Sequence, residues 1–233
     1  MVVSLQMGWR HVLFANWPTS PRIVESHLPE ALSLDTYDGA AWLSVIPFTN
    51  VDVRPRIFPS AIGLPVPELN LRTYVRHDET PGVYFFSLDA QGILAVLGAR
   101  LFHHLPYYYA RIDLEQESGG VRFTSRRRHP GERPVHFEAA YRPDDGQFSA
   151  EPGTLTWFLT ERYRYYTEDQ NGRIRHAEIQ HDPWPLFDVE VEIEENTLFR
   201  ANGFEPPDTE PVHFYSPGVD TVASNSRRSS DGP

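Results

Sequence analysis

Hydrophobic and polar residues alternate along much of the chain, in short runs separated by residues typical of turns. Alternation with a period of two predicts strands that bury one face only. We expect strands over residues 8–17, 41–48, 69–77, 83–89, 107–117, 121–128, 136–142, 162–167, 173–179 and 186–193. The pattern therefore predicts a protein built mainly of sheet.

Turn residues connect several of these strands. Ser118-Gly119-Gly120 and Asn171-Gly172 each predict a hairpin, because glycine and asparagine tolerate the positive φ of tight turns. Short helices are expected after Ser20-Pro21 and over residues 91–102, 153–160 and 194–202, the last closed by Gly203. Four prolines predict an irregular loop over residues 53–67.

These elements predict a β-rich α+β fold with a few short helices. Because hairpins dominate, the sheets should be mostly antiparallel and curved, forming either a barrel or two packed sheets. The length suits a single domain, which we place at residues 1–224. The polar residues 225–233 predict a disordered tail.

Charge and hydropathy narrow the class of protein. The 233 residues carry a formal net charge of −11, which disfavours binding to nucleic acid. The run Arg126-Arg127-Arg128 is a local exception that we interpret as a solvated edge or turn. No apolar stretch is long enough to span a bilayer and the first residues do not resemble a signal peptide, so we expect a cytoplasmic protein.

The chain contains no lysine and no cysteine. An amine nucleophile, a thiolate nucleophile, a disulfide and a thiolate metal site are therefore all excluded. The sequence motifs of serine hydrolases, zincins, Rossmann enzymes and P-loop proteins are also absent. The sequence predicts no cofactor and no metal site.

Five segments carry a resemblance to a known family. They are LFANWP from Leu13, LNLRTYV from Leu69, GVYFFSLD from Gly82, LTERY from Leu159 and IEENTL from Ile193. In this order they resemble the YqjF-like family of uncharacterised prokaryotic proteins, over residues 7–222. That family is similar in fold to acetoacetate decarboxylase, so the resemblance implies a cone-like closed β structure around a buried site.

The resemblance also locates the reactive site of the decarboxylase. That enzyme forms a Schiff base on a lysine that follows a Phe-Pro pair and precedes a second lysine. The corresponding stretch here is Leu105-Pro106-Tyr107-Tyr108, so tyrosines stand at both lysine positions. A phenol cannot form an imine, so the resemblance implies the decarboxylase fold without its chemistry.

The first candidate site is the alternating set Asn70, Arg72, Tyr74 and Arg76, which shares one face of a strand. If that face lines the barrel, its arginines can hold a carboxylate or a phosphate. If it faces solvent, the set is an ordinary polar strand surface. Polarity alone does not decide between the two interpretations.

A second candidate site combines Arg100 with His103 and His104 at the end of the expected helix. A histidine there can act as general acid or base, but arginine and histidine also stabilise a helix C-terminus without any ligand. The aromatic triplet Tyr107-Tyr108-Tyr109 is typical of a core or a cavity lining.

Glutamates provide the remaining candidate chemistry. Glu161 lies beside Arg162 and is either a structural ion-pair partner or a general base. Glu194 and Glu195 suit the start of the expected helix, and His176 and His181 show no spacing of metal ligands.

The combined hypothesis is a soluble protein that binds a small anion, for example a carboxylate, in a cavity lined by arginine and aromatic residues. One alternative is a lyase or isomerase that uses histidine and glutamate as acid and base. Another is a structural or interaction protein. The sequence does not determine the ligand or the oligomeric state, and a homo-oligomer is compatible with it.

Overall fold

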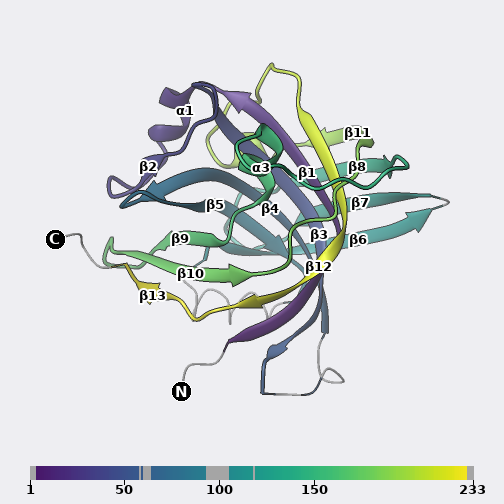
Figure 1. Ribbon diagram of the computed structural model, residues 1–233, viewed down its shortest axis with the longest axis horizontal. Helices are drawn as coiled ribbons and strands as arrows, with labels where there is room; N and C mark the ends of the chain where they lie inside the picture. Colours follow the sequence, from purple (N-terminus) through teal and green to yellow (C-terminus); the bar gives the residue numbers. More distant parts are fainter. Residues whose placement is uncertain (1–3, 58, 60–63, 93–104, 118, 230–233) are drawn as a thin grey trace.

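The computed structural model of the chain describes residues 4–57, 59, 64–92, 105–117 and 119–229. Its helices are α1 (Pro21–Glu25), α3 (Leu155–Thr160) and α4 (Leu198–Ala201). Its strands are β1 (Leu5–Thr19), β2 (Ser33–Leu34), β3 (Ala41–Pro55), β4 (Leu64–His77), β5 (Thr80–Ala90), β6 (Tyr107–Glu117), β7 (Gly120–Arg127), β8 (His136–Pro143), β9 (Arg164–Glu168), β10 (Ile174–Gln180), β11 (Val189–Asn196), β12 (Val212–Ala223) and β13 (Arg227–Arg228). The predicted β-rich fold with a few short helices is confirmed (Figure 1).

Seven of the described strands close into a barrel. Backbone pairing runs from β5 through β9, β10, β12, β1, β3 and β4 and returns to β5. All of these pairs are antiparallel except β5 with β9. Closure matters for function because a barrel leaves an interior that side chains either fill or leave open.

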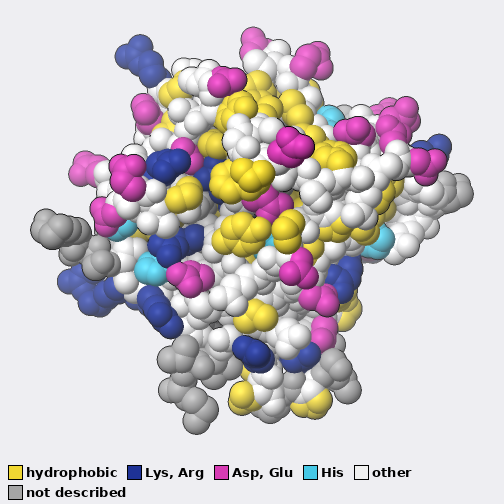
Figure 2. Space-filling view, in the orientation of Figure 1, with side chains coloured by type: hydrophobic (Ala, Val, Ile, Leu, Met, Phe, Trp, Pro, Cys, Tyr) yellow, Lys and Arg dark blue, Asp and Glu magenta, His cyan; other side chains and the backbone are white. Residues whose placement is uncertain are grey.

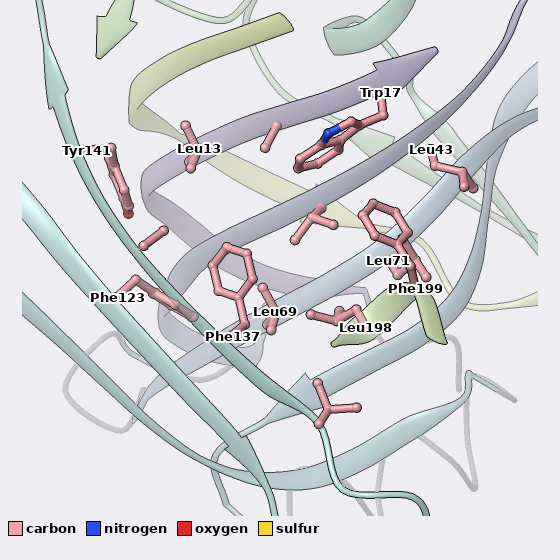
Figure 3. Close-up of a cluster of buried hydrophobic side chains, with 14 of the residues drawn as sticks. Leu13, Trp17, Leu43, Leu69, Leu71, Phe123, Phe137, Tyr141, Leu198 and Phe199 are labelled. Atoms are coloured by element: carbon pink, nitrogen blue, oxygen red, sulfur yellow. The ribbon is translucent and has the colours of Figure 1, made fainter. Parts of the chain in front are cut away.

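A second sheet covers one side of the barrel. Its strands β6, β7, β8 and β11 pair in that order, and β6 joins the barrel through a parallel pairing with β5. Figure 3 shows rings from this sheet, such as Phe123 and Phe137, directed towards Leu13 and Leu69 of the barrel. We call the buried side chains between this sheet and the barrel the sandwich core. They pack against the outer face of the barrel wall.

The alternation of β4 divides its side chains between the two layers. Leu69 and Leu71 are fully buried in the sandwich core. Asn70 and Arg72 point to the other side, where they line a cavity inside the barrel. The interpretation of this strand as a solvent-facing surface therefore does not hold for these two residues.

A hairpin turn and two helix ends have the residues that the sequence predicts there. Asn171-Gly172 connects β9 to β10, with Gly172 at a φ of 75°. Pro21 opens α1, and Gly203 follows α4 with a φ of 85°. These positions require residues that either preset φ or tolerate positive φ.

The expected loop over residues 53–67 is shorter than predicted, because β3 continues to Pro55 and β4 begins at Leu64. Pro65 and Pro67 lie within β4. The carbonyl oxygen of Pro67 accepts a hydrogen bond from the N–H of Gln91, just beyond the end of β5. Proline has no N–H to donate to a neighbouring strand. Because β5 has already ended at this position, no hydrogen bond between strands is lost, and proline is tolerated there.

Three other predictions need correction. The helix expected over 194–202 begins only at Leu198, because Glu194 and Glu195 belong to β11. The expected tail is in part a strand, since β13 pairs with β10. The strand β12 was not predicted at all. The helix expected over 91–102 lies almost wholly outside the described residues.

The arginine run on β7 is also not a solvated edge throughout. Arg126 and Arg128 are exposed, but Arg127 is only 6% exposed. Its guanidinium donates to both carboxylate oxygens of Asp89, at 2.6 and 3.1 Å, and lies 4.0 Å from the centre of the Tyr108 ring. Strand alternation turns this one arginine inwards, where a buried carboxylate neutralises it.

Figure 2 shows carboxylates and arginines interspersed over one face of the molecule, with hydrophobic side chains near its centre. None of the described helices is long and apolar enough to cross a membrane.

Candidate functional site

The barrel encloses a cavity of about 730 Å³. Its wall is mostly apolar and aromatic, with contributions from β1, β3, β4, β5, β9, β10 and β12. The polar and charged side chains that line it are Asn50, Glu68, Asn70, Arg72, Tyr107, Thr160, Arg162, Arg164, Tyr165, His181, Asn225 and Ser226. A large apolar space with a few polar groups is the usual form of a small-molecule site.

The predicted set on β4 is only partly brought together in this cavity. Asn70 and Arg72 line it. Tyr74 is fully buried beyond it and donates a hydrogen bond to the carbonyl oxygen of Leu159. Arg76 lies near the end of the strand, where it pairs with Asp35 at 2.9 Å and its side chain is 40% exposed. The strand thus passes from the cavity wall to the surface.

Glu68 is a cavity residue that the sequence did not reveal as a candidate. Its side chain accepts hydrogen bonds from Asn50 Nδ2 at 2.9 Å and from the Tyr107 hydroxyl at 3.0 Å. The residue is only 4% exposed, and burial raises the pKa of its carboxyl to about 7, although the bonds from Tyr107, Asn70 and Asn50 act in the opposite direction. Glu68 therefore changes its charge near neutral pH.

The signal that identifies Glu68 was present in the sequence. Glu68 lies two residues before Asn70 and continues the same alternation. Pro65 and Pro67 obscured it, because they made the segment look like a loop.

Three of the described arginines line the cavity, and they differ in how their charge is neutralised. Arg162 pairs with Asp35 at 2.8 Å, and Arg164 pairs with Glu178 at 2.8 Å. Arg72 donates one hydrogen bond, from Nη2 to the carbonyl oxygen of Leu159 at 3.0 Å. Among the described residues Arg72 has no carboxylate partner, and its buried Nε has no acceptor. Its charge is therefore not balanced by any described carboxylate.

Aromatic rings surround the guanidinium of Arg72 and form the neighbouring wall. The guanidinium carbon lies 5.7 Å from the ring centres of Phe14 and of Tyr74. Trp9 stacks on Trp184 with ring centres 5.7 Å apart, and His181 contacts both rings. Burial lowers the pKa of His181, and the charge of Arg72 acts in the same direction, whereas the hydrogen bond with the Asp182 carbonyl oxygen acts in the opposite one.

The tyrosine triplet is divided between two environments by the alternation of β6. Tyr107 lines the cavity, and burial together with the neighbouring Glu68 raises its pKa well above the ordinary value. Its hydroxyl therefore stays protonated as a hydrogen-bond donor. Tyr108 lies against Arg127. The two tyrosines that the resemblance places at lysine positions thus have different surroundings.

The remaining candidates do not join this cluster. Arg100, His103 and His104 lie outside the described residues. Glu161 is buried and accepts hydrogen bonds from the Tyr163 hydroxyl at 2.5 Å and from the backbone N–H of Trp184 at 3.1 Å. No ion pair between described residues includes it. Within the described parts of the chain, no three histidines or carboxylates are grouped as metal ligands would be.

Comparison with known proteins places the chain in a family. Residues 6–220 match the model of the DUF2071 family, described as an uncharacterized conserved protein. The chain belongs to this family. It is 43% identical over 219 residues to the uncharacterized protein YqjF of Bacillus subtilis (strain 168), which covers 94% of the chain and 89% of that protein. The predicted family is confirmed.

Solved structures with similar folds include acetoacetate decarboxylases and the biosynthetic enzyme MppR. The decarboxylase of Legionella pneumophila has a TM-score of 0.64 at 12% identity, covering 97% of this chain and 87% of that one. The enduracididine biosynthesis enzyme MppR, complexed with pyruvate, has a TM-score of 0.63 at 13% identity, covering 97% and 90%. At these identities the similarity shows the fold alone, and it confirms the predicted acetoacetate decarboxylase-like architecture.

Proposed function

We propose that the protein binds a small organic carboxylate in the barrel cavity, with Arg72 as its anion contact. The observation that carries the proposal is the arginine that has no carboxylate partner among the described residues. Arg72 is half-buried, and its Nε is fully buried without an acceptor. Removing part of a cation from water is costly unless an anion or several acceptors accompany it. Arg162 and Arg127 each have an aspartate, whereas Arg72 has a single carbonyl oxygen.

The rest of the cavity favours a carboxylate with an apolar body. Its wall is largely apolar and aromatic, so the body of the ligand should be apolar. A volume of about 730 Å³ lies within the range of pockets for small organic molecules. One neighbour in fold is complexed with pyruvate, which is a small carboxylate. Without lysine, binding here involves no Schiff base.

Two fluorescent probes of similar shape test the anion contact. Anilinonaphthalene sulfonate is anionic and N-phenylnaphthylamine is neutral, and both brighten in apolar sites. We expect Arg72→Met to weaken binding of the anionic probe about tenfold, which corresponds to about 1.4 kcal/mol. Binding of the neutral probe should be unchanged.

Arg76→Met provides the matched control, because it removes the same charge from the same strand outside the cavity. It should affect neither probe. Near-ultraviolet circular dichroism would verify that both variants retain native packing. If Arg72→Met left the affinity for the anionic probe unchanged, or weakened both probes equally, Arg72 would not be the anion contact.

Glu68 favours a second candidate function, acid–base catalysis on a bound carbonyl compound. A carboxylate with a pKa of about 7 can remove a proton from carbon next to a ketone, and the electron pair then moves onto the ketone oxygen. Returning a proton to that carbon restores the ketone, so the net reaction is exchange of this proton with water. Tyr107 holds Glu68 in place through its hydroxyl.

Hydrogen exchange into deuterated water tests this candidate. The probe is 5-oxohexanoate, which carries a ketone for Glu68 and a carboxylate for Arg72 in one small molecule. We expect the protein to accelerate loss of the proton signals next to the ketone, with a rate that rises as the pH passes about 7. Glu68→Gln should abolish the acceleration. Equal rates for the variant and the native protein would eliminate this candidate.

A further inference from the structure

Arginines gather on one edge of this acidic protein, along the β9–β10 hairpin and β13. Arg175 of β10 lies opposite Arg228 of β13, and His176 lies opposite Arg227. Arg173 and Arg228 are close enough to Asp169 to help lower its pKa, after the hydrogen bonds from the Asn171 and Arg173 N–H groups. Figure 2 shows arginine and histidine side chains at the lower left, where Figure 1 places β10 and β13.

The charge of this group is only partly balanced, by the nearby carboxylate of Asp169. We call Arg173, Arg175, Arg227 and Arg228 the arginine rim. No ion pair of the described residues includes any of the four, whereas Arg10, Arg76, Arg122 and Arg164 each bind a carboxylate. Arg175 instead donates to two neutral acceptors, the hydroxyl and the carbonyl oxygen of Ser226, both at 2.9 Å.

The arginine rim adjoins the cavity. Ser226, which Arg175 holds, is itself a lining residue, and so are Asn225 and Arg164. Lining side chains at this end, including Leu5 and Pro55, are only half-buried. Phe14 and Leu88, further along the cavity, are nearly fully buried. Among the described residues, the cavity is therefore most open beside the arginine rim.

We propose that the arginine rim is an electrostatic entrance that speeds the association of anionic ligands with the cavity. This inference rests on the proposed binding of a carboxylate. A protein with a net charge of −11 repels anions at long range, and such repulsion slows their encounter with any site. A local group of cations beside the opening offsets this repulsion there. Such steering acts on the association rate and is screened by salt.

Stopped-flow fluorescence with anilinonaphthalene sulfonate tests the entrance, using the variant Arg227→Glu/Arg228→Glu. Both side chains are exposed, so the substitutions remove no core contact. At an ionic strength of about 20 mM we expect the association rate constant to fall about 5- to 10-fold, and the difference to vanish near 300 mM as screening shortens its range. The dissociation rate constant should not change.

Arg126→Glu/Arg142→Glu is the matched control, because these exposed arginines lie on β7 and β8 of the second sheet and alter the net charge equally. It should change the association rate constant less than about 2-fold, which separates a local entrance from net charge. N-phenylnaphthylamine, which is neutral, should enter all three proteins at the same rate.

The failure of the entrance and the failure of the binding site are distinguishable. Equal effects of the two double variants, or an effect confined to dissociation, would overturn the entrance while leaving the Arg72 contact intact. Binding of the anionic probe that is insensitive to Arg72→Met would overturn the proposed function, and the entrance with it.

Discussion

The sandwich core and the barrel interior share the strands β1, β3 and β4, yet one is filled with rings and the other encloses about 730 Å³. On β4 the two environments alternate residue by residue, with Leu69 and Leu71 on the filled side and Glu68, Asn70 and Arg72 on the hollow side. The sandwich core supports the barrel wall from outside. Polar side chains that line the cavity can then keep fixed positions, because the wall does not collapse around them.

The largest expected effect is a difference in how much the sandwich core and the cavity wall contribute to the free energy of unfolding. Phe137 is fully buried in the sandwich core, and Phe48 is nearly as buried but borders the cavity. Phe137→Ala should lower the free energy of unfolding by about 3–5 kcal/mol, because the lost ring leaves a new void. Phe48→Ala should cost about half as much, because its ring already borders empty space.

Denaturant unfolding of both variants measures this difference. Equal losses would show that the cavity wall is packed as tightly as the sandwich core, and would contradict the contrast between the layers.

A smaller effect is expected from Glu68, the buried carboxyl group that lines the cavity. Burial raises the pKa of Glu68 from 4.5 to about 7, so the folded state binds more protons than the unfolded state between these values. The stability associated with neutral Glu68 is therefore complete below pH 4.5 and is lost as the pH rises through about 7. The loss amounts to about 3 kcal/mol at most.

Glu68→Gln should remove this pH dependence. Relative to the native protein, the variant should gain stability between pH 5 and pH 8, as measured by urea unfolding at each pH. Glu190→Gln on the exposed face of β11 serves as control and should follow the native protein. If the difference in the free energy of unfolding between the native protein and Glu68→Gln did not change with pH, the raised pKa of Glu68 would be contradicted.

Much of the fold could be predicted because local chemistry and tertiary packing agree. The strand β6 begins and ends at the predicted residues, and the Asn171-Gly172 hairpin forms as expected. Prediction failed where a turn signal lies inside a long strand. Pro217-Gly218 resembles a turn, but Gly218 continues β12 at a φ of 129° opposite Arg10. A Cβ atom there would lie 1.8 Å from the Trp9 carbonyl oxygen, so glycine serves a close contact between strands.

The candidate site was also predicted only in part. Asn70, Arg72 and Tyr107 were candidates because of their types and positions, and all three line the cavity. Glu68 was missed because nearby prolines indicated a loop. His181 was dismissed because its spacing fits no metal site, yet it contacts two tryptophans of the cavity wall.

The sequence by itself determined the chemistry that is excluded and the faces of the strands. The absence of lysine and cysteine removes amine and thiolate catalysis wherever the chain folds, and a period of two assigns neighbouring side chains to opposite faces of a strand. Only the tertiary structure decided which face is filled and which arginine keeps an unpaired charge. Asp35 and Arg162 are far apart in the chain, as are Asp89 and Arg127, so these pairings depend on how the barrel closes rather than on local pattern. Among the described residues, Arg72 remains without a carboxylate for the same reason.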